Sequence, residues 1–163
     1  IAYFGGVSED VIAEVLRTFS GVEHRIELCG ELNGVRFVND SKGTNPDAAI
    51  KAIEAMKENI ILIAGGYDKK VPYDVLGPEI CTHVSKLFLN GHTAQQIREA
   101  VEKCGGETPE IVMCGDFESA VYAAAAAAKP GDVVLMSPAS PAFDQFKNFM
   151  VRGTFFKKLI MEL

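Results

Sequence analysis

Residues 60–64 form an uninterrupted apolar run that ends in two glycines, and this run constrains the possible folds of the chain most strongly. A strand with one face in water alternates apolar and polar residues, whereas a continuous apolar run is typical of a strand that is covered on both faces. Such strands lie in sheets that pack between layers of helices. We therefore expect a buried sheet with helices on both faces.

Segments with apolar residues at helical spacing alternate with short strand-like runs along the chain. Asn45 and Asp116 are suited to cap helices, and Pro46 suits a first helical position. Asn33-Gly34 supplies the left-handed backbone of a tight hairpin. The expected strands are residues 25–29, 35–39, 60–64, 86–90, 111–114 and 133–136. Because helices link most of them, we expect an α/β fold: a three-layer α/β/α, Rossmann-like domain with a six-stranded, mainly parallel sheet and one hairpin.

Other helix signals are more local. Ser8 is placed to cap a helix near the beginning of the chain, and Thr93 has capping-box spacing to Gln96. Gly77-Pro78 is expected to interrupt a helical region. Apolar residues at helical spacing in residues 155–163 predict a final amphipathic helix.

The composition argues against several classes of protein. Of 163 residues, 48% are hydrophobic and 23% are charged, which is typical of one packed soluble domain. The net charge of −6 argues against a nucleic-acid partner, because such proteins need a basic face. The apolar runs are shorter than the roughly 20 residues that cross a bilayer, and no basic and apolar leader is visible. We therefore expect a cytoplasmic protein with no membrane partner.

Cysteine and histidine residues give no sign of a metal site or a catalytic triad. The four cysteines have no pair at metal-binding spacing and are expected to be reduced thiols; they are Cys29, Cys81, Cys104 and Cys114. His24 and His83 have no serine or cysteine at a recognisable motif spacing. The same holds for His92, which lies at the expected ligand edge and is kept as a contact candidate.

The loop at residues 39–45 is the first candidate for chemistry, because ligands of such sheets bind beyond the carboxyl ends of the strands. Lys42 and Thr44 lie at the start of a helix, where an anion is favoured. Asp40 is suited to accept a hydrogen bond from a ribose hydroxyl or to hold a hydrated cation. The alternative is that these residues only cap the helix and form a solvated turn.

Two further loops lie at the same expected edge. Gly65-Gly66 permits a close backbone approach to a ligand, and Lys69 adds a positive charge, although a plain turn is an equal alternative. The order of residues that defines a P-loop is absent from the chain. In the third loop Phe143, Phe146 and Phe149 have a spacing that is more typical of a core than of ligand contacts.

Taken together, these segments resemble the C-terminal domain of the Mur ligases, in particular the members that add D-glutamate. The resemblance covers the whole chain, with residues 21–163 similar to the C-terminal domain and residues 1–20 similar to the last helix of the central ATPase domain. It is carried by the segments at residues 24–25, 33–36, 39–45, 65–66 with 69, 137–139, 144–149 and 152–153.

The resemblance implies an ATP-dependent ligation through an acyl phosphate. On the family pattern Lys42 is catalytic and stands near the acyl phosphate, while Arg25 and Asp40 contact ATP. Thr44 and Lys69 match positions that bind the α-carboxylate of D-glutamate.

The side-chain carboxylate of D-glutamate is bound in the family by a serine hydroxyl and by backbone N–H groups. Phe143 and Phe149 keep those backbone donors, but Ala142 stands in the place of the serine. The hydroxyl of Ser140 is a candidate to replace it.

The resemblance also implies partners that this chain does not bind by itself. ATP and magnesium are held mainly by the central domain, and UDP-N-acetylmuramoyl-L-alanine is bound by domains that this sequence lacks, so the chain alone is expected to be inactive. Two alternatives stay open. One is a nucleotide-binding module without catalysis, and the other is a related ligase that adds a different amino acid.

Overall fold

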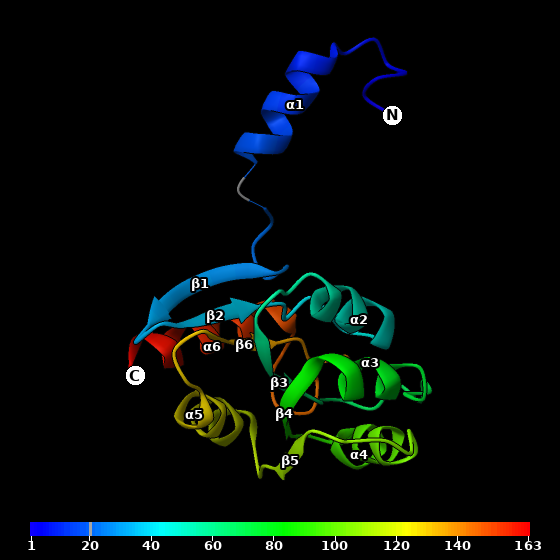
Figure 1. The fold of residues 1–163 in the computed structure, drawn as a ribbon, viewed down its shortest axis with the longest axis vertical. Coiled ribbons are helices and arrows are strands. Elements are labelled where there is room, and N and C mark those ends of the chain that lie inside the picture. The colour runs from blue at the N-terminus through cyan, green and yellow to red at the C-terminus, as the bar shows by residue number, and fades with distance from the viewer. Residues whose placement is uncertain (20) are drawn as a thin grey trace.

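The computed structural model describes residues 1–19 and 21–163. The strands, which all lie after residue 26, form one six-stranded sheet covered by helices. The strands lie in the order β1-β2-β6-β3-β4-β5. β1 pairs with β2 antiparallel, and the other neighbouring strands pair in parallel (Figure 1). The strands are β1 (Glu27–Leu32), β2 (Val35–Asn39), β3 (Asn59–Ala64), β4 (Val84–Leu89), β5 (Glu110–Met113) and β6 (Asp132–Met136). The expected α/β class, with a mainly parallel sheet and one hairpin, is confirmed.

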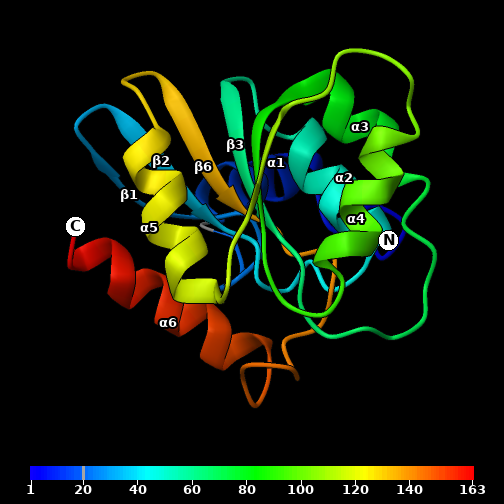
Figure 2. The same cartoon turned by 90° about the horizontal axis from the view of Figure 1, so that it is seen from below.

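Helices cover both faces of the sheet and create two cores (Figure 2). One core contains residues of α2, α3 and α4, and the other contains residues of α5 and α6. Ile60 and Leu62 of β3 lie in the first core, whereas Ile61 and Ile63 lie in the second. This alternation explains why β3 is apolar throughout. The helices are α1 (Glu9–Thr18), α2 (Pro46–Glu54), α3 (Leu76–His83), α4 (Ala94–Glu102), α5 (Phe117–Ala127) and α6 (Phe149–Met161).

Several local signals are confirmed at the residue level. The side chain of Asn45 accepts a hydrogen bond from the N–H of Ala48 at the start of α2, and Asp116 accepts one from Ser119 at the start of α5. Asn33 and Gly34 have φ angles of 52° and 77°, as the tight hairpin requires.

Two expected strands begin later or earlier than the sequence suggests. β1 begins at Glu27 and not at residue 25, because His24 and Ile26 have left-handed φ angles of 65° and 46° that are incompatible with an extended strand. β4 begins at Val84, directly after α3, and not at residue 86.

Three helix expectations need correction. Gly77-Pro78 does not interrupt a helix but lies in the first turn of α3, where the missing N–H of proline costs no hydrogen bond. The Thr93 side chain does not cap α4, because its hydroxyl is hydrogen-bonded to Ser140 instead. Ser8 precedes α1 as expected, but its side chain makes no capping hydrogen bond.

α1 stands clear of the sheet, and none of its residues is buried (Figure 1). Residue 20, where the expected boundary between the two domains falls, lies outside the described residues. Within residues 1–19 and 21–163, no helix has the length and apolar character needed to cross a membrane.

Gly65, at the end of β3, has a φ angle of 106°, and an added Cβ would overlap the carbonyl oxygen of Asn90. We expect Gly65→Ala to reduce the free energy of unfolding by about 3 kcal/mol, since both backbone strain and a backbone clash oppose it. Gly131→Ala is the matched control, because Gly131 has a φ of 96° and open space around it. That variant should lose about 1 kcal/mol. Urea unfolding measures both, and equal losses would contradict the close approach at Gly65.

Candidate functional site

Three loops meet at the carboxyl ends of β2, β6 and β3, which are neighbours in the sheet. The N–H of Asp40 donates to the carbonyl oxygen of Met136 at 2.8 Å, which joins the loop after β2 to the last residue of β6. The N–H of Gly65 donates to the carbonyl oxygen of Pro138 at 2.8 Å, which joins the loop after β3 to the loop after β6. The structure therefore brings together the three loops that the sequence singled out.

The Arg152 side chain of α6 is 2% exposed and fastens two of these loops to each other. Its Nε donates to the hydroxyl of Ser41 at 3.0 Å. Its Nη2 donates to the carbonyl oxygens of Ser41 and Ser140 at 2.9 and 3.0 Å. The hydroxyl of Ser41 in turn donates to the carbonyl oxygen of Phe149 at 2.7 Å, so the first turn of α6 joins the same network.

Burial lowers the pKa of Arg152 to about 10, against the raising effect of the Asp144 and Asp40 carboxylates. The guanidinium therefore stays charged at neutral pH. Arg152 lies in one of the segments that carry the family resemblance, but the sequence alone assigns it no role in the site. A single arginine among helix-spaced apolar residues carries no signal that it is buried.

A cavity of about 230 Å³ is lined by the predicted catalytic residue Lys42 and by the predicted cofactor-binding residues Arg25 and Asp40. It lies between the segment before β1 and the start of α2. The rest of its lining consists of Ile26, Gly43, Ala48 and Lys51. Within the described residues, no three His, Cys, Asp or Glu side chains converge in a way that would hold a metal ion.

Asp40 is 4% exposed, and both of its carboxylate oxygens are hydrogen-bonded within the protein. One oxygen accepts from the hydroxyl of Ser137 at 2.6 Å, and the other accepts from the N–H of Ile26 at 3.3 Å. Burial raises the pKa of Asp40, against the lowering effect of the Ser137 hydrogen bond. Asp40 therefore holds the loops of this cavity in place. Its remaining lone pairs can still accept hydrogen bonds from a ligand.

A second cavity, of about 170 Å³, is lined by all four predicted substrate-binding residues. Thr44 and Lys69 come from the loops after β2 and β3, and Phe143 and Phe149 come from the loop after β6 and the start of α6. Pro141, Ala142 and Asn148 complete the lining. The polar part of the lining therefore consists of the Thr44 hydroxyl, the Lys69 ammonium and the amino end of α6. These groups favour an anionic ligand.

Lys42 belongs to the first cavity and lies near a residue of the second. It lines the first cavity, and its Nζ lies 6.0 Å from the ring centroid of Phe149, which lines the second. Within the described residues, neither Lys42 nor Lys69 forms a salt bridge. The lysines that do are Lys51, Lys70, Lys86, Lys103, Lys157 and Lys158. Both ammonium groups therefore keep hydrogen-bond donors available for a ligand.

The carboxylate of Asp68 fixes the loop that carries Lys69. It accepts hydrogen bonds from the N–H and the Nζ of Lys70 at 2.6 and 2.7 Å, and from the side chain of Gln96 at 3.0 Å. The bonds from Lys70, followed by the bond from Gln96, lower the pKa of Asp68 to about 2. The sequence does not indicate this clamp, because the spacing of Thr93 and Gln96 predicts a capping box instead.

The hydroxyl of Ser140 is not available to replace the family's serine, in whose place Ala142 stands. Ser140 is fully buried, and its hydroxyl lies 2.8 Å from the hydroxyls of both Tyr73 and Thr93. Of the three phenylalanines in this region, Phe146 packs against Phe117 as a core residue, whereas Phe143 is 58% exposed at the cavity.

His92 does not line the second cavity but stands next to it, because its ring lies 6.1 Å from that of Tyr67. The Tyr67 ring in turn lies 6.0 Å from that of Phe143. His92 is thus separated from the candidate site by one aromatic side chain.

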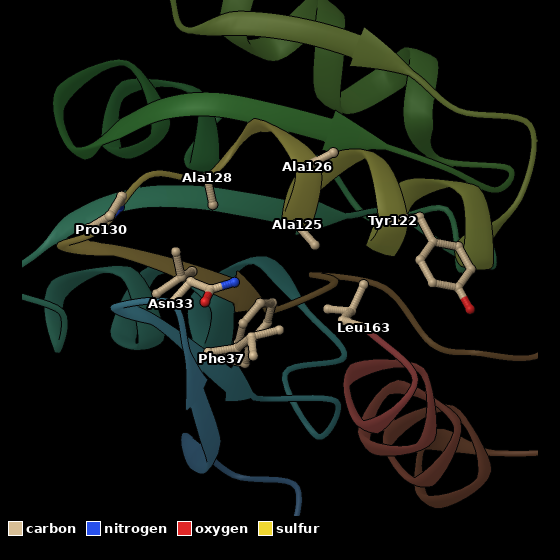
Figure 3. Close-up of a pocket in the computed structure, with 10 residues that line it drawn as sticks. Asn33, Phe37, Tyr122, Ala125, Ala126, Ala128, Pro130 and Leu163 are labelled. Atoms are coloured by element: carbon tan, nitrogen blue, oxygen red, sulfur yellow. The ribbon is translucent and has the colours of Figure 1, made fainter.

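A larger cavity, of about 490 Å³, lies beside the β1–β2 turn and the segment that leads into β6 (Figure 3). Its lining is mostly apolar, with Asn33 and Tyr122 as the polar side chains. It lies at the amino end of β6 and so at the end of the strand opposite to the three loops. It contains none of the predicted site residues.

Comparison with protein families gives a match for residues 24–140 to the family described as "Mur ligase, glutamate ligase domain". A UDP-N-acetylmuramoylalanine–D-glutamate ligase from a Thermoanaerobacter species is 52% identical over 163 residues, which are 100% of this chain and 36% of the relative. The ligase of the same name from Acetivibrio thermocellus is 50% identical over 94% of this chain and 34% of the relative. The chain thus spans about a third of the length of these curated relatives.

Among solved structures, a bifunctional folylpolyglutamate synthase/dihydrofolate synthase from Yersinia pestis, complexed with AMPPNP and a manganese ion, has a TM-score of 0.62. It is 16% identical, and the match covers 94% of this chain and 35% of that protein. This similarity supports the fold.

The Asp68 clamp predicts a specific pH dependence of stability. The pKa of Asp68 is about 2 in the folded chain, against an ordinary value of 3.8, so its contribution is complete above pH 4 and is lost as the pH falls toward 2. Asp68→Asn should therefore reduce the urea midpoint at pH 6, and the difference from the unsubstituted chain should shrink below pH 4. Lys70→Met removes only one of the hydrogen bonds and should show a smaller effect. A difference that does not change with pH would contradict the clamp.

Proposed function

Because the chain belongs to the Mur ligase family, we propose that it is the C-terminal, amino-acid-binding domain of an ATP-dependent ligase. The proposed whole enzyme acts in the cytoplasm, where it joins D-glutamate to UDP-N-acetylmuramoyl-L-alanine in peptidoglycan precursor synthesis. One observation carries the proposal. The predicted nucleotide contacts and the predicted amino-acid contacts line two separate cavities, and Lys42 lines the first with its Nζ 6.0 Å from the ring centroid of Phe149 of the second.

The proposed reaction needs a cation at the boundary between the two cavities. The γ-phosphoryl group of ATP is transferred to the carboxylate of UDP-N-acetylmuramoyl-L-alanine, which forms an acyl phosphate and releases ADP. The amine of D-glutamate then attacks the acyl carbon and gives up a proton to solvent, an amide bond forms, and the bond from the acyl carbon to the phosphate oxygen breaks as phosphate leaves. We assign to the Lys42 ammonium the stabilisation of negative charge on the acyl phosphate and the departing phosphate, because a cation placed there lowers the barrier.

The second cavity is the proposed site of D-glutamate. The Thr44 hydroxyl and the Lys69 ammonium bind the α-carboxylate, each as a hydrogen-bond donor. The side-chain carboxylate is bound by backbone N–H groups at Phe143 and Phe149. Ala142 offers no hydroxyl, and Ser140 is occupied in the core, so these N–H groups bind the side-chain carboxylate without a serine.

The first cavity is the proposed contribution of this chain to ATP binding. Arg25 is exposed and provides a charged fork that suits phosphate, and Asp40 offers its remaining lone pairs to a ribose hydroxyl. Magnesium, when bound, neutralises charge on the phosphates, and we assign its ligands mainly to the central domain.

Residues 1–20 are proposed to belong to the preceding central ATPase domain, and residues 21–163 form the C-terminal domain. The apolar residues of α1 support this division, because they are exposed to an unusual extent for an amphipathic helix. The exposed large apolar side chains of α1 are Val11, Val15 and Leu16, and that of Phe19, directly after the helix, is exposed as well.

The two alternatives predict different behaviour. A nucleotide-binding module without catalysis would bind ATP or NAD as an isolated chain, and it gives no reason for an ammonium group between two cavities. A ligase for another amino acid would place other contacts in the second cavity. The names of the curated relatives favour D-glutamate over that alternative.

Substitutions in the two cavities should affect different substrates of the full-length parent enzyme. Lys69→Met should raise KM for D-glutamate by roughly tenfold to a hundredfold, the effect of losing one charged hydrogen bond, and leave KM for ATP unchanged. Arg25→Met should raise KM for ATP by a similar factor and leave KM for D-glutamate unchanged. Steady-state measurement of phosphate release with each substrate varied gives both constants.

Lys129→Met is the matched control, because Lys129 is exposed and follows α5, far from both cavities along the sheet. It should change neither constant. The 163-residue chain alone is the baseline and should release no phosphate. Equal effects of Lys69→Met and Arg25→Met on both substrates, or turnover by the chain alone, would contradict the proposal.

A further inference from the structure

The segment at residues 24–26 is strained on both sides of Arg25. His24 has a φ of 65° and Ile26 has a φ of 46°. Left-handed backbone is uncommon for any residue other than glycine, and it is especially unfavourable for a β-branched residue such as isoleucine. Such a conformation persists only where surrounding contacts determine it.

Hydrogen bonds hold this segment on both sides. The N–H of His24 donates to the Glu27 carboxylate at 2.9 Å, and the N–H of Ile26 donates to the Asp40 carboxylate at 3.3 Å. The N–H of Lys42 donates to the carbonyl oxygen of His24 at 3.0 Å. The strained segment is thus tied to the loop that carries Asp40 and Lys42.

The His24 side chain is a second anchor. It is 4% exposed, and its Nδ1 lies 3.0 Å from the side-chain nitrogen of Asn39. Its ring packs edge-on against Phe149, with 6.1 Å between the ring centroids, and its imidazole fills the space in which Gly153 lacks a Cβ. The backbone around Arg25 is therefore fixed by the sheet, by α6 and by the loop after β2.

Arg25 itself is exposed, and within residues 1–19 and 21–163 its side chain makes no hydrogen bond or salt bridge, although its charge acts on the nearby Asp40 carboxylate. Its backbone N–H donates to the carbonyl oxygen of Val22 at 3.0 Å. A long arginine side chain on a free backbone would sample many directions and would lose that freedom when a ligand binds. With the residues on either side fixed in left-handed backbone, the backbone of Arg25 is held at the cavity that it lines with Asp40 and Lys42.

We infer that His24 and Ile26 are positioning residues whose strained backbone holds Arg25 over the nucleotide cavity. This inference rests on the proposed function, because it takes the polyphosphate of ATP as the ligand of Arg25. It assigns a role to two residues that do not themselves contact the reacting atoms. It also explains why a β-branched residue stands where glycine would relieve the strain: glycine would free the backbone that aims Arg25.

Ile26 allows a test in which stability and binding change in opposite directions. Ile26→Ala and Ile26→Gly both remove the side chain from the cavity wall, but only glycine relieves the left-handed strain and frees the backbone. Relative to Ile26→Ala, the Ile26→Gly chain should unfold at a higher temperature. In the full-length parent, Ile26→Gly should nevertheless have a KM for ATP roughly tenfold above that of Ile26→Ala, with equal KM for D-glutamate.

Arg25→Met separates the failure of this inference from the failure of the proposed function. If Arg25→Met raises KM for ATP while Ile26→Gly and Ile26→Ala share the same KM, the positioning role is wrong and the proposed function stands. If Ile26→Gly is no more stable than Ile26→Ala, no strain is stored at residue 26 and the inference is overturned. If Arg25→Met leaves KM for ATP unchanged, Arg25 does not bind the nucleotide, and both the assignment and the inference built on it fail.

Discussion

A single buried charge, the guanidinium of Arg152, holds the ligand edge of this sheet together. Its donors are shared between the hydroxyl and carbonyl oxygens of Ser41 and the carbonyl oxygen of Ser140, so loops that are about a hundred residues apart in sequence meet on one side chain. A buried cation is costly unless its hydrogen bonds are satisfied and acidic groups lie near. Asp40 and Asp144 supply that negative charge, and both belong to the loops that Arg152 joins.

This network explains how one edge presents two cavities of different character. The Asp40 carboxylate is held by Ser137 and by the N–H of Ile26, and it lines the first cavity together with the cationic residues Arg25 and Lys42. Lys69 faces the second cavity from a loop that the Asp68 carboxylate clamps. Rigid placement of cations before a ligand arrives is what a polyanionic substrate and a charged transition state require.

Sequence reasoning succeeded where the signal is local and failed where it depends on distant partners. Asn45 and Asp116 cap helices, and Asn33-Gly34 turns a hairpin, because each acts on its own backbone. The site loops were found because carboxyl ends of parallel strands gather at one edge. The left-handed backbone at Ile26 depends on Asp40, fourteen residues away, and the burial of Arg152 depends on loops from two other strands. No sequence pattern within either segment indicates those contacts.

Hydrogen exchange of the Arg152→Met chain tests most directly whether the three loops form one unit held by this guanidinium. If they do, the amides of Asp40, Lys42 and Gly65 should all exchange faster than in the unsubstituted chain, by roughly tenfold or more, while amides inside β3 and β6 stay protected. Faster exchange confined to α6, with Asp40, Lys42 and Gly65 unchanged, would contradict the account.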